Sequence, residues 1–359
     1  METVVESSVE ARVKRWGRSL GFDAVAIAGT DLARDEARLI EWLGRGWHGE
    51  MDYMARHGAR RARPAELVPG TISVITARLN YTPPGARDSW QTLEDPSSAF
   101  VSRYALGRDY HKVLRAKLQA LADRMTAELG PFHYRVFTDT APVMEVSLAA
   151  MSGLGWRGKH TLLLSRDAGS LFFLGELFVS LDLARDAPVT AHCGTCERCI
   201  DICPTKAIVA PYQLDARRCV SYLTIEHHGA IPEELRPLMG NRIYGCDDCQ
   251  LVCPWNKYAS VANDPDFAVR NHLDRASLVG LFAWTEEEFL QRFEGSAIRR
   301  IGHERWLRNI AVALGNAPTS ADVVRALESR RDHPSPLVRE HVAWALARHA
   351  SPRRSASVP

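Results

Sequence analysis

The cysteines most constrain this chain of 359 residues, because all eight lie between positions 193 and 253. The first run reads Cys193-x2-Cys196-x2-Cys199-x3-Cys203-Pro204. The second run reads Cys246-x2-Cys249-x3-Cys253-Pro254, and Cys219 stands alone between the two. A Cys-x2-Cys-x2-Cys loop can place three thiolates around one iron–sulfur cube, while the cysteine before proline ligates the other cube.

This spacing predicts two [4Fe–4S] clusters with no cysteine left over. The first is held by Cys193, Cys196, Cys199 and Cys253, and the second by Cys203, Cys219, Cys246 and Cys249. Two all-cysteine zinc sites are the alternative, but the repeated x3-Cys-Pro ending favours iron–sulfur. Residues 221–245 fill most of the gap after Cys219. A simple electron-relay module does not need such an insertion, so we expect it to face another part of the protein.

The bulk composition is that of a globular protein with two or three domains, since 46% of the residues are hydrophobic and 25% are charged. The first twenty residues mix acids with bases and contain no apolar run, so they do not form a secretory signal. No stretch approaches the roughly eighteen apolar residues of a membrane helix. We therefore expect a cytoplasmic protein without a membrane span, in which clustered cysteines bind metal rather than form disulfides.

Three domains are predicted along the chain: residues 1–185 as a mixed α/β domain, 186–265 as a ferredoxin-like double-cluster module, and 275–350 as all-α. In the first domain, residues 9–20 have a helical pattern, and the segment 103–130 becomes a helix that ends near Gly130. Residues 22–29, 71–81, 133–140 and 170–181 read as strands. Pro142 fits the first turn of a helix that Gly153 closes. Strands that alternate with helices indicate a layered α/β sandwich.

The C-terminal part is helical and basic. Residues 309–314 resemble residues 341–346, an offset of 32 that indicates a short HEAT-like helical repeat. Gly295 to Arg354 holds eleven Arg and Lys against five Asp and Glu, whereas the preceding residues hold 34 against 38. This basic end could face a polyanion or be a solvated helical surface. The tail from Ser351 is expected to be disordered.

Three further stretches resemble the epoxyqueuosine reductase family: SRYALGRDYHK, DTAPVMEVSLAAMSGLGWRGKHTLLL and NRIYGCDDCQLVCPWN. With the cysteine runs, the resemblance covers the chain from about Arg12 to the helical repeat. It implies an oxidoreductase that reduces epoxyqueuosine, at the wobble position of certain tRNAs, to queuosine in the last step of queuosine biosynthesis. Members use cobalamin and two [4Fe–4S] clusters, in a core related to corrinoid-dependent reductive dehalogenases.

The same resemblance implies that cobalt has no protein histidine ligand. In agreement, Asp109-Tyr-His111-Lys-Val-Leu114 lacks the glycine of the Asp-x-His-x-x-Gly signature. Asp139 corresponds to the family's proton donor, and we expect it to be partly buried with a raised pKa. Without the resemblance, Asp139 would read as a helix cap. The positions expected to contact cobalamin are Arg61, Ser102, Asp139, Lys159, His160, Thr161, Leu163, Leu174, Val220, Ser221, Gly245, Cys246, Asp247 and Asp248.

The expected partners are the anticodon stem-loop of a tRNA that carries epoxyqueuosine and a low-potential electron donor of flavodoxin or ferredoxin type. Electrons are expected to enter at the solvent-side cluster and reach cobalt through the second cluster. We expect a monomer. The residues predicted to contact tRNA are His227, Arg299, Arg300, Arg305 and Arg308. The alternatives are a dehalogenase-like enzyme for a small substrate and a two-cluster electron carrier, although neither needs a basic helical end.

Overall fold

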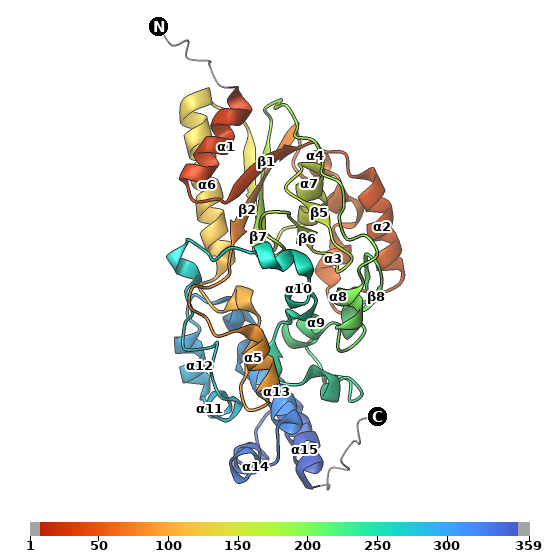
Figure 1. The fold of residues 1–359 in the computed structure, drawn as a ribbon, viewed down its shortest axis with the longest axis vertical. Helices are drawn as coiled ribbons and strands as arrows, with labels where there is room; N and C mark the ends of the chain where they lie inside the picture. The colour runs from red at the N-terminus through yellow and green to blue at the C-terminus, as the bar shows by residue number, and fades with distance from the viewer. Residues whose placement is uncertain (1–7, 351–359) are drawn as a thin grey trace.

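A four-stranded sheet forms the centre of the N-terminal part (Figure 1). The computed structural model describes residues 8–350, so the tail from Ser351 lies outside the described residues. The strand order is β1 (Ala24–Ala28), β2 (Ser73–Asn80), β7 (Phe172–Val179) and β4 (Tyr134–Phe137), and all neighbours are antiparallel. All of β2 is buried, including its polar residues Ser73, Thr76, Arg78 and Asn80. The predicted layered α/β sandwich is therefore present, with an antiparallel sheet.

Helices cover both faces of the sheet (Figure 1). On one face, α1 (Val9–Ser19) and α6 (Tyr110–Leu129) pack against a cluster that includes Ile75 and Leu177. On the other face, α7 (Glu145–Met151) packs against a cluster that includes Val74 and Phe178. Successive strand residues point to opposite faces, so Val74 and Ile75 serve different layers.

One predicted helix begins later than the sequence indicated. Pro142 was expected in its first turn, but α7 begins at Glu145. The preceding residues form tight turns instead, with the amide of Ala141 donating to Thr138 O (2.9 Å) and that of Val143 to Ala141 O (2.8 Å). This places Asp139 in a turn after β4 rather than at the cap of the helix.

The remaining short elements of the N-terminal part and the cysteine segment connect the larger ones. Short helices are α2 (Ala33–Gly44), α3 (Asp52–Arg56), α4 (Pro64–Leu67), α5 (Ser89–Glu94), α8 (Arg198–Asp201), α9 (Val220–Ile225) and α10 (Asp248–Leu251). Short strands are β3 (Phe100–Val101), β5 (Trp156–Arg157), β6 (Leu163–Leu164), β8 (Ile208–Ala210), β9 (Gln213–Leu214) and β10 (Arg242–Tyr244).

The insertion after Cys219 faces other parts of the protein, as expected. Its strand β10 pairs in parallel with β3. Its helix α9 is almost wholly buried, and the hydroxyl of Tyr222 accepts a hydrogen bond from the amide of Glu50 (2.8 Å). The side-chain amide of Asn309 donates to Thr224 O and Ile243 O, both at 2.9 Å. The insertion thus joins the N-terminal sheet domain to the C-terminal helices.

The C-terminal part is all-helical, with α11 (Leu278–Phe282), α12 (Glu286–Arg292), α13 (Gly302–Asn316), α14 (Ala321–Glu328) and α15 (Pro336–Ala350). Helices α13 and α15 pack closely, since a Cβ on Gly315 would lie 3.0 Å from Cα of Ala345. No helix among residues 8–350 is long and apolar enough to cross a membrane.

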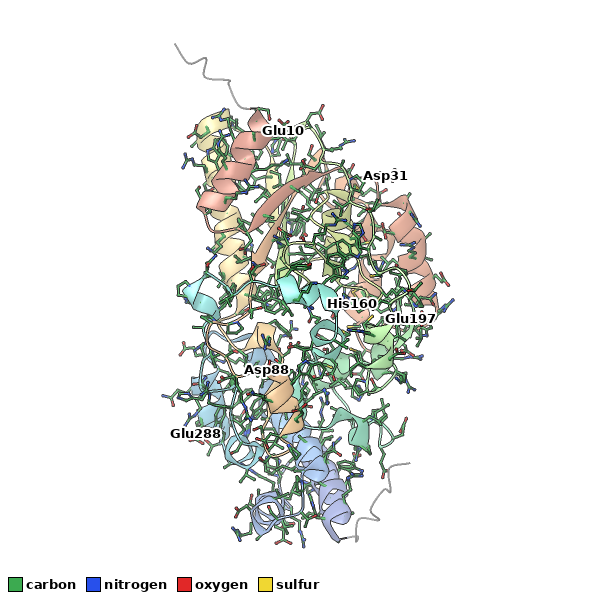
Figure 2. All side chains as sticks on the ribbon, in the orientation of Figure 1. Glu10, Asp31, Asp88, His160, Glu197 and Glu288 are labelled. Carbon is green, nitrogen blue, oxygen red and sulfur yellow. The ribbon has the colours of Figure 1, made fainter. Side chains whose placement is uncertain are left out.

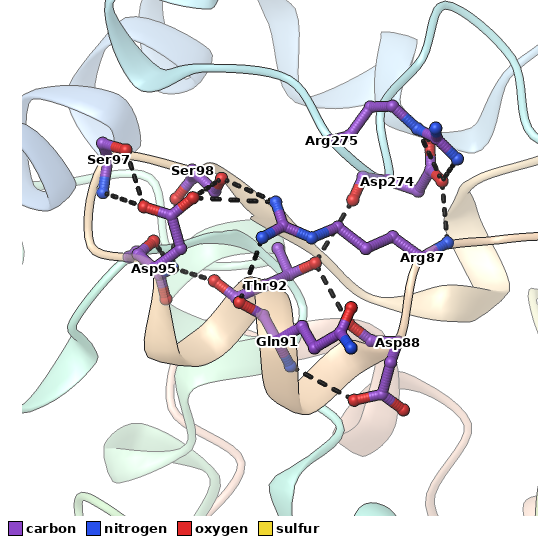
Figure 3. Close-up of polar contacts among 10 residues, drawn as sticks. Arg87, Asp88, Gln91, Thr92, Asp95, Ser97, Ser98, Asp274 and Arg275 are labelled. Atoms are coloured by element: carbon purple, nitrogen blue, oxygen red, sulfur yellow. Dashed lines mark hydrogen bonds and ion pairs between the residues drawn. The ribbon is translucent and has the colours of Figure 1, made fainter.

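A polar network fixes the segment that enters these helices (Figure 3). The amide of Arg87 donates to Asp274 Oδ2 at 2.8 Å, and the guanidinium of Arg275 donates to the same oxygen at 2.9 Å. Nearby, hydrogen bonds from Ser97 and Ser98 lower the pKa of Asp95 to about 2. The loop around α5 is thereby tied to the chain just before α11.

Candidate functional site

The eight cysteines are free thiols and gather into two groups of four. Cysteine group 1 consists of Cys193, Cys196, Cys199 and Cys253, which line one cavity of about 280 Å³. Cysteine group 2 consists of Cys203, Cys219, Cys246 and Cys249, whose thiols lie close enough to perturb one another electrostatically. This division is the one that the spacing predicts.

Burial disfavours the thiolate form of cysteines in both groups. In cysteine group 2, burial and then neighbouring charged groups raise the pKa of Cys246 and Cys249 well above the usual range. In cysteine group 1, burial and the neighbouring Cys253 raise the pKa of Cys199 to about 11. Thiols of this kind become thiolates when a metal supplies positive charge. The chemistry of both groups therefore fits iron–sulfur ligation.

A cavity of about 640 Å³ lies on the α7 side of the sheet, and we call it the Asp139 cavity. Besides Asp139, its lining includes Arg61, Glu145, Glu226 and Arg300. A second cavity of about 480 Å³, the adjoining cavity, shares part of the lining. The shared residues are Leu39, Met54, Met144, Arg157 and Thr161. The two cavities together form a large space with both apolar and charged walls.

Asp139 is held at this cavity by the start of α6. The Nε2 atom of His111 lies 2.9 Å from Asp139 Oδ1, and the Tyr110 hydroxyl donates to Asp139 Oδ2. The other ring nitrogen of His111 lies 2.7 Å from Asp109 Oδ1. Tyr110 is fixed in turn by Phe173, because the two rings stack with centroids 4.1 Å apart. Three side chains at the start of α6 and one from β7 therefore determine the position of one carboxylate.

Asp139 was expected to be partly buried with a raised pKa, and both expectations were wrong, because its side chain is 42% exposed and its pKa is lowered. Partial desolvation acts to raise this pKa, but the hydrogen bond and positive charge of His111, together with the hydrogen bond from Tyr110, outweigh it, so the pKa lies below its ordinary value. For His111, burial acts to lower the pKa, but the bonds to Asp109 and Asp139 raise it to about 9. The proton of this pair therefore resides on His111 at neutral pH. The sequence signal was present in RDYHK, which places a histidine two residues after an acid at a helix start.

Two of the predicted cobalamin contacts line the Asp139 cavity with Asp139. Arg61 is buried and donates to Tyr53 O (2.9 Å) and Ala141 O (3.4 Å), while its Nε has no acceptor among the described residues. Thr161 has a φ of 76°, a conformation that side chains rarely adopt. Arg61 therefore supports the turn that carries Asp139, and Thr161 lies at the junction of the two cavities.

Five other predicted contacts lie around the turn that carries Cys246 of cysteine group 2. The hydroxyl of Ser102 donates to Asp247, and the amide of Gly245 donates to Thr224 Oγ1 at 2.9 Å. The thiol of Cys246 contacts Asp248 Oδ2 at 2.8 Å. These residues form a buried polar layer beside cysteine group 2. Val220 and Ser221 begin α9, directly after Cys219.

Lys159 and His160 line the cavity of cysteine group 1 rather than the Asp139 cavity. Lys159 Nζ lies 3.8 Å from Glu197 Oε1, and Figure 2 labels Glu197 together with His160, the residue after Lys159. Burial lowers the pKa of His160 to about 4, so its ring is neutral. Leu163 is buried in an apolar cluster, and Leu174 packs against that cluster.

The five predicted tRNA contacts differ in their exposure. Arg299 and Arg300 are exposed, and Arg300 also lines the Asp139 cavity, with its guanidinium 3.1 Å from Glu226 Oε1. Arg305 is half-buried and donates to Ile225 O at 2.9 Å. His227 bonds to Glu50 Oε1 at 2.9 Å and to Ala230 O at 2.8 Å.

Arg308 is a correction to the predicted tRNA surface. Its side chain is 0% exposed, so it cannot reach a phosphate. Its guanidinium donates to the carbonyl oxygens of Leu223 (2.6 Å), His227 (2.7 Å) and Gly229 (2.9 Å). Burial lowers the pKa of Arg308 to about 9. Arg308 therefore fixes the insertion on α13.

The chain matches two family models and is similar to proteins of known function. Residues 192–256 match the family model "4Fe-4S double cluster binding domain", and residues 61–140 match "Epoxyqueuosine reductase QueG, DUF1730". The chain is 61% identical over 339 residues to an epoxyqueuosine reductase of Xanthomonas campestris, covering 94% of this chain and 96% of that protein.

Two solved structures are also similar. An epoxyqueuosine reductase with a tRNA-Tyr epoxyqueuosine-modified stem loop has a TM-score of 0.86 and 28% identity, covering 95% of this chain and 90% of the other. A Bacillus subtilis epoxyqueuosine reductase, whose catalytic aspartate loop is swung out of the active site, has a TM-score of 0.85 and 27% identity, covering 94% and 90%.

Proposed function

The chain belongs to the epoxyqueuosine reductase family, and we propose that Asp139, cobalamin and both cysteine groups serve its reaction. It is an oxidoreductase that reduces epoxyqueuosine in tRNA to queuosine. The observation that carries the proposal is the Asp139 cavity, where a carboxylate paired with a protonated histidine faces a space of about 640 Å³. A dehalogenase-like enzyme or an electron carrier is not favoured, because the similarity to epoxyqueuosine reductases extends over 94% of the chain.

The residues around the two cavities fit cobalamin, which is a large ring with an apolar body and polar amide edges. The buried Nε atoms of Arg61 and Arg157 have no acceptor among the described residues, and both side chains line the Asp139 cavity. Leu39, Met54 and Met144 supply apolar wall. Bound there, cobalamin would supply two-electron reducing chemistry at cobalt. Arg61 and Thr161 would orient it from the side of the Asp139 turn, without a histidine ligand to cobalt.

The chain carries a double [4Fe–4S] domain, and cysteine groups 1 and 2 would each hold one cluster. Cys196 is exposed whereas Cys203 is buried. Electrons from a low-potential flavodoxin- or ferredoxin-type donor would therefore enter at cysteine group 1 and move inward to cysteine group 2. The polar layer of Ser102, Gly245 and Asp247 next to cysteine group 2 would lie on the route to the cofactor.

The proton would reach the substrate oxygen through Asp139. Removing an epoxide oxygen as water takes two electrons and two protons. Because His111 carries the proton at neutral pH and its Nε2 lies 2.9 Å from Asp139, we assign His111 as the source that loads Asp139. Asp109 holds the opposite ring nitrogen at 2.7 Å and orients the imidazole. Tyr110 donates to the other carboxylate oxygen of Asp139 and so keeps Oδ1 directed toward His111.

The tRNA would approach across the basic residues before α13. Arg300 lines the cavity mouth and Arg299 is its exposed neighbour, so both are placed to bind phosphates of an anticodon loop whose modified base enters the cavity. Residues 275–350 would form a HEAT-like repeat that supports this surface, next to a sheet domain (1–185) and a cluster domain (186–265). We expect a monomer that works in the cytoplasm, where tRNA is modified.

One experiment tests this function. The protein is reconstituted with iron and sulfide under anaerobic conditions and incubated with epoxyqueuosine-containing tRNA and a low-potential reductant, with or without cobalamin. Nucleoside analysis should find queuosine only when cobalamin is present. Queuosine in the absence of cobalamin, or its absence in both samples with both clusters intact, would contradict the proposal.

A further inference from the structure

A second pair of carboxyl groups lies beneath the Asp139 cavity. Glu145 is the first residue of α7 and lines the cavity. Glu176 lies in the middle of β7 and is 0% exposed. Its position in the strand register places it beside Thr76 of β2 and Phe137 of β4, on the face that α7 covers. The carboxyls of Glu145 and Glu176 lie close enough to affect each other electrostatically.

The contacts of this pair require a proton. Neither carboxyl oxygen of Glu176 has a donor among the described residues, and Glu145 Oε1 has none either. Two carboxylates without donors would repel each other strongly in a buried site, whereas one protonated carboxyl can donate to the other. The pair is therefore stable when it shares at least one hydrogen.

The charges around the pair support this state. Burial first, and then the neighbouring Glu176 and Asp139, raise the pKa of Glu145 well above its ordinary value. Burial raises the pKa of Glu176 to about 8, and Asp139 adds to the effect. Arg61, from the segment before α4, opposes it by favouring the charged form of Glu145. Tyr110 of α6 is a further titratable group that interacts with Glu145.

We propose that Glu145 and Glu176 form a proton reservoir that supplies the second of the two protons consumed in each reduction. This inference rests on the proposed function. In the overall step, both C–O bonds of the epoxide break and a carbon–carbon double bond forms. Two electrons come from the external reductant, and the oxygen leaves as water with two protons. The His111–Asp139 pair provides one proton, and Glu145, at the cavity wall, provides the other and is replenished from Glu176.

The geometry explains why a reservoir is needed. Asp139 and His111 share a single transferable proton, and a bound tRNA loop would separate the cavity from bulk water. Asp139, at the start of the turn 139–144, and Glu145, directly after that turn, line the same cavity. Glu176 is behind Glu145 and does not line the cavity. Glu176 therefore acts through Glu145, as a positioning and proton-storage residue.

The first test is spectroscopic and needs no cofactor or substrate. Infrared spectra of the full-length protein should contain the carbonyl stretch of a protonated carboxyl at pH 7, and this band should fade as the pH rises above about 8. The double variant Glu145→Gln/Glu176→Gln should remove it. The exposed Glu328 on α14 offers a matched control, and Glu328→Gln should keep it. A wild-type spectrum without such a band at pH 7 would overturn the proposal.

The second test is kinetic and separates storage from structure. In a single anaerobic turnover with reconstituted enzyme, Glu145→Gln should slow queuosine formation by about 10²-fold or more, as expected for lost acid catalysis. Glu176→Gln should slow it less and should remove the fall in rate that the wild type shows as pH rises through about 8. Tm values of both variants show whether they fold, and Glu176→Asp should restore the pH dependence. Wild-type rates and pH profiles in both Gln variants, while the wild type makes queuosine, would refute the reservoir and leave the proposed function intact.

Discussion

The Nε2 atom of His111 lies 2.9 Å from Oδ1 of Asp139, and this contact places the proton of the pair on the imidazole. The carboxylate at the cavity is thus ionised at rest and can be loaded by a neighbouring acid. Asp139 could hold its own proton at neutral pH only if desolvation raised its pKa more than its hydrogen bonds lower it. The opposite occurs at Asp139.

Replacing His111 should change the pH dependence of the reaction. Because the pKa of His111 is raised to about 9, the wild-type rate should fall as pH rises through about 9. In His111→Gln, the rate at pH 7 should drop by about 10²-fold, since the acid that loads Asp139 is gone. The measurement is the rate of single-turnover queuosine formation between pH 6 and pH 10. An unchanged profile would show that His111 does not supply the proton.

The same pair should make stability depend on pH. The folded-state pKa of His111 is raised, so its stabilisation is fully present below about 6.5 and is lost as pH rises from there through about 9. The loss should be at most about 3 kcal/mol, because the pKa of His111 moves from its ordinary 6.5 to about 9. Denaturant unfolding of wild type and His111→Gln at pH 6 and pH 9.5 measures it. The two proteins should differ more at pH 6 than at pH 9.5, and the reverse order would contradict the ion pairing.

Removing Cys219 should cost one cluster and leave the other. Cys219 lies with Cys203, Cys246 and Cys249, so Cys219→Ala should reconstitute with about half the iron of the wild type. The variant should also fail to form queuosine. Cys196→Ala, in cysteine group 1, is the matched variant and should lose the other half. Full iron content in Cys219→Ala would show that this thiol is not a ligand.

Neutralising Arg299 and Arg300 should weaken tRNA binding without unfolding the protein. Both are exposed before α13, so the double variant to Gln should bind tRNA more weakly, with the slope of log K against log salt less steep by roughly one to two units. Filter binding at several salt concentrations gives both quantities. Equal affinity and equal slope would exclude these arginines from the tRNA surface.

Arg308 should behave differently from its exposed neighbours. Its guanidinium donates to the carbonyls of Leu223, His227 and Gly229, so Arg308→Met would leave these buried acceptors unpaired. Each such group costs about 1–3 kcal/mol, and we expect a loss of at least about 3 kcal/mol in unfolding free energy. Chemical denaturation gives the value. A loss below 1 kcal/mol would contradict the structural role of Arg308.

The sequence sufficed for features that depend on local pattern. Buried runs predicted β1, β2 and β7 because consecutive apolar residues need cover on both faces of a sheet. The cysteine spacing predicted both groups of four because short loops limit which thiols can meet. The family motifs identified Asp139. Each of these signals lies within a few residues, or within one recurrent motif.

Tertiary packing decided what the sequence could not show. Arg308 occurs in an arginine-rich segment like that of Arg299, and its burial depends on carbonyls more than 75 positions away. His111 meets Asp139 across 28 positions, because α6 and the turn after β4 lie together. Glu176 was not predicted as a site residue, although it is the only charged residue in the strand FFLGELFV. A carboxyl in a fully buried strand calls for a functional or paired role.

The most direct measurement of the central claim is nucleoside analysis after one anaerobic turnover of Asp139→Asn, beside the wild type, with both clusters and cobalamin bound. The isosteric amide keeps the shape of the side chain but cannot carry a proton to the substrate. We predict that the wild type converts epoxyqueuosine to queuosine and that the variant binds the same tRNA with similar affinity and leaves epoxyqueuosine intact. Conversion by Asp139→Asn at the wild-type rate would contradict the account.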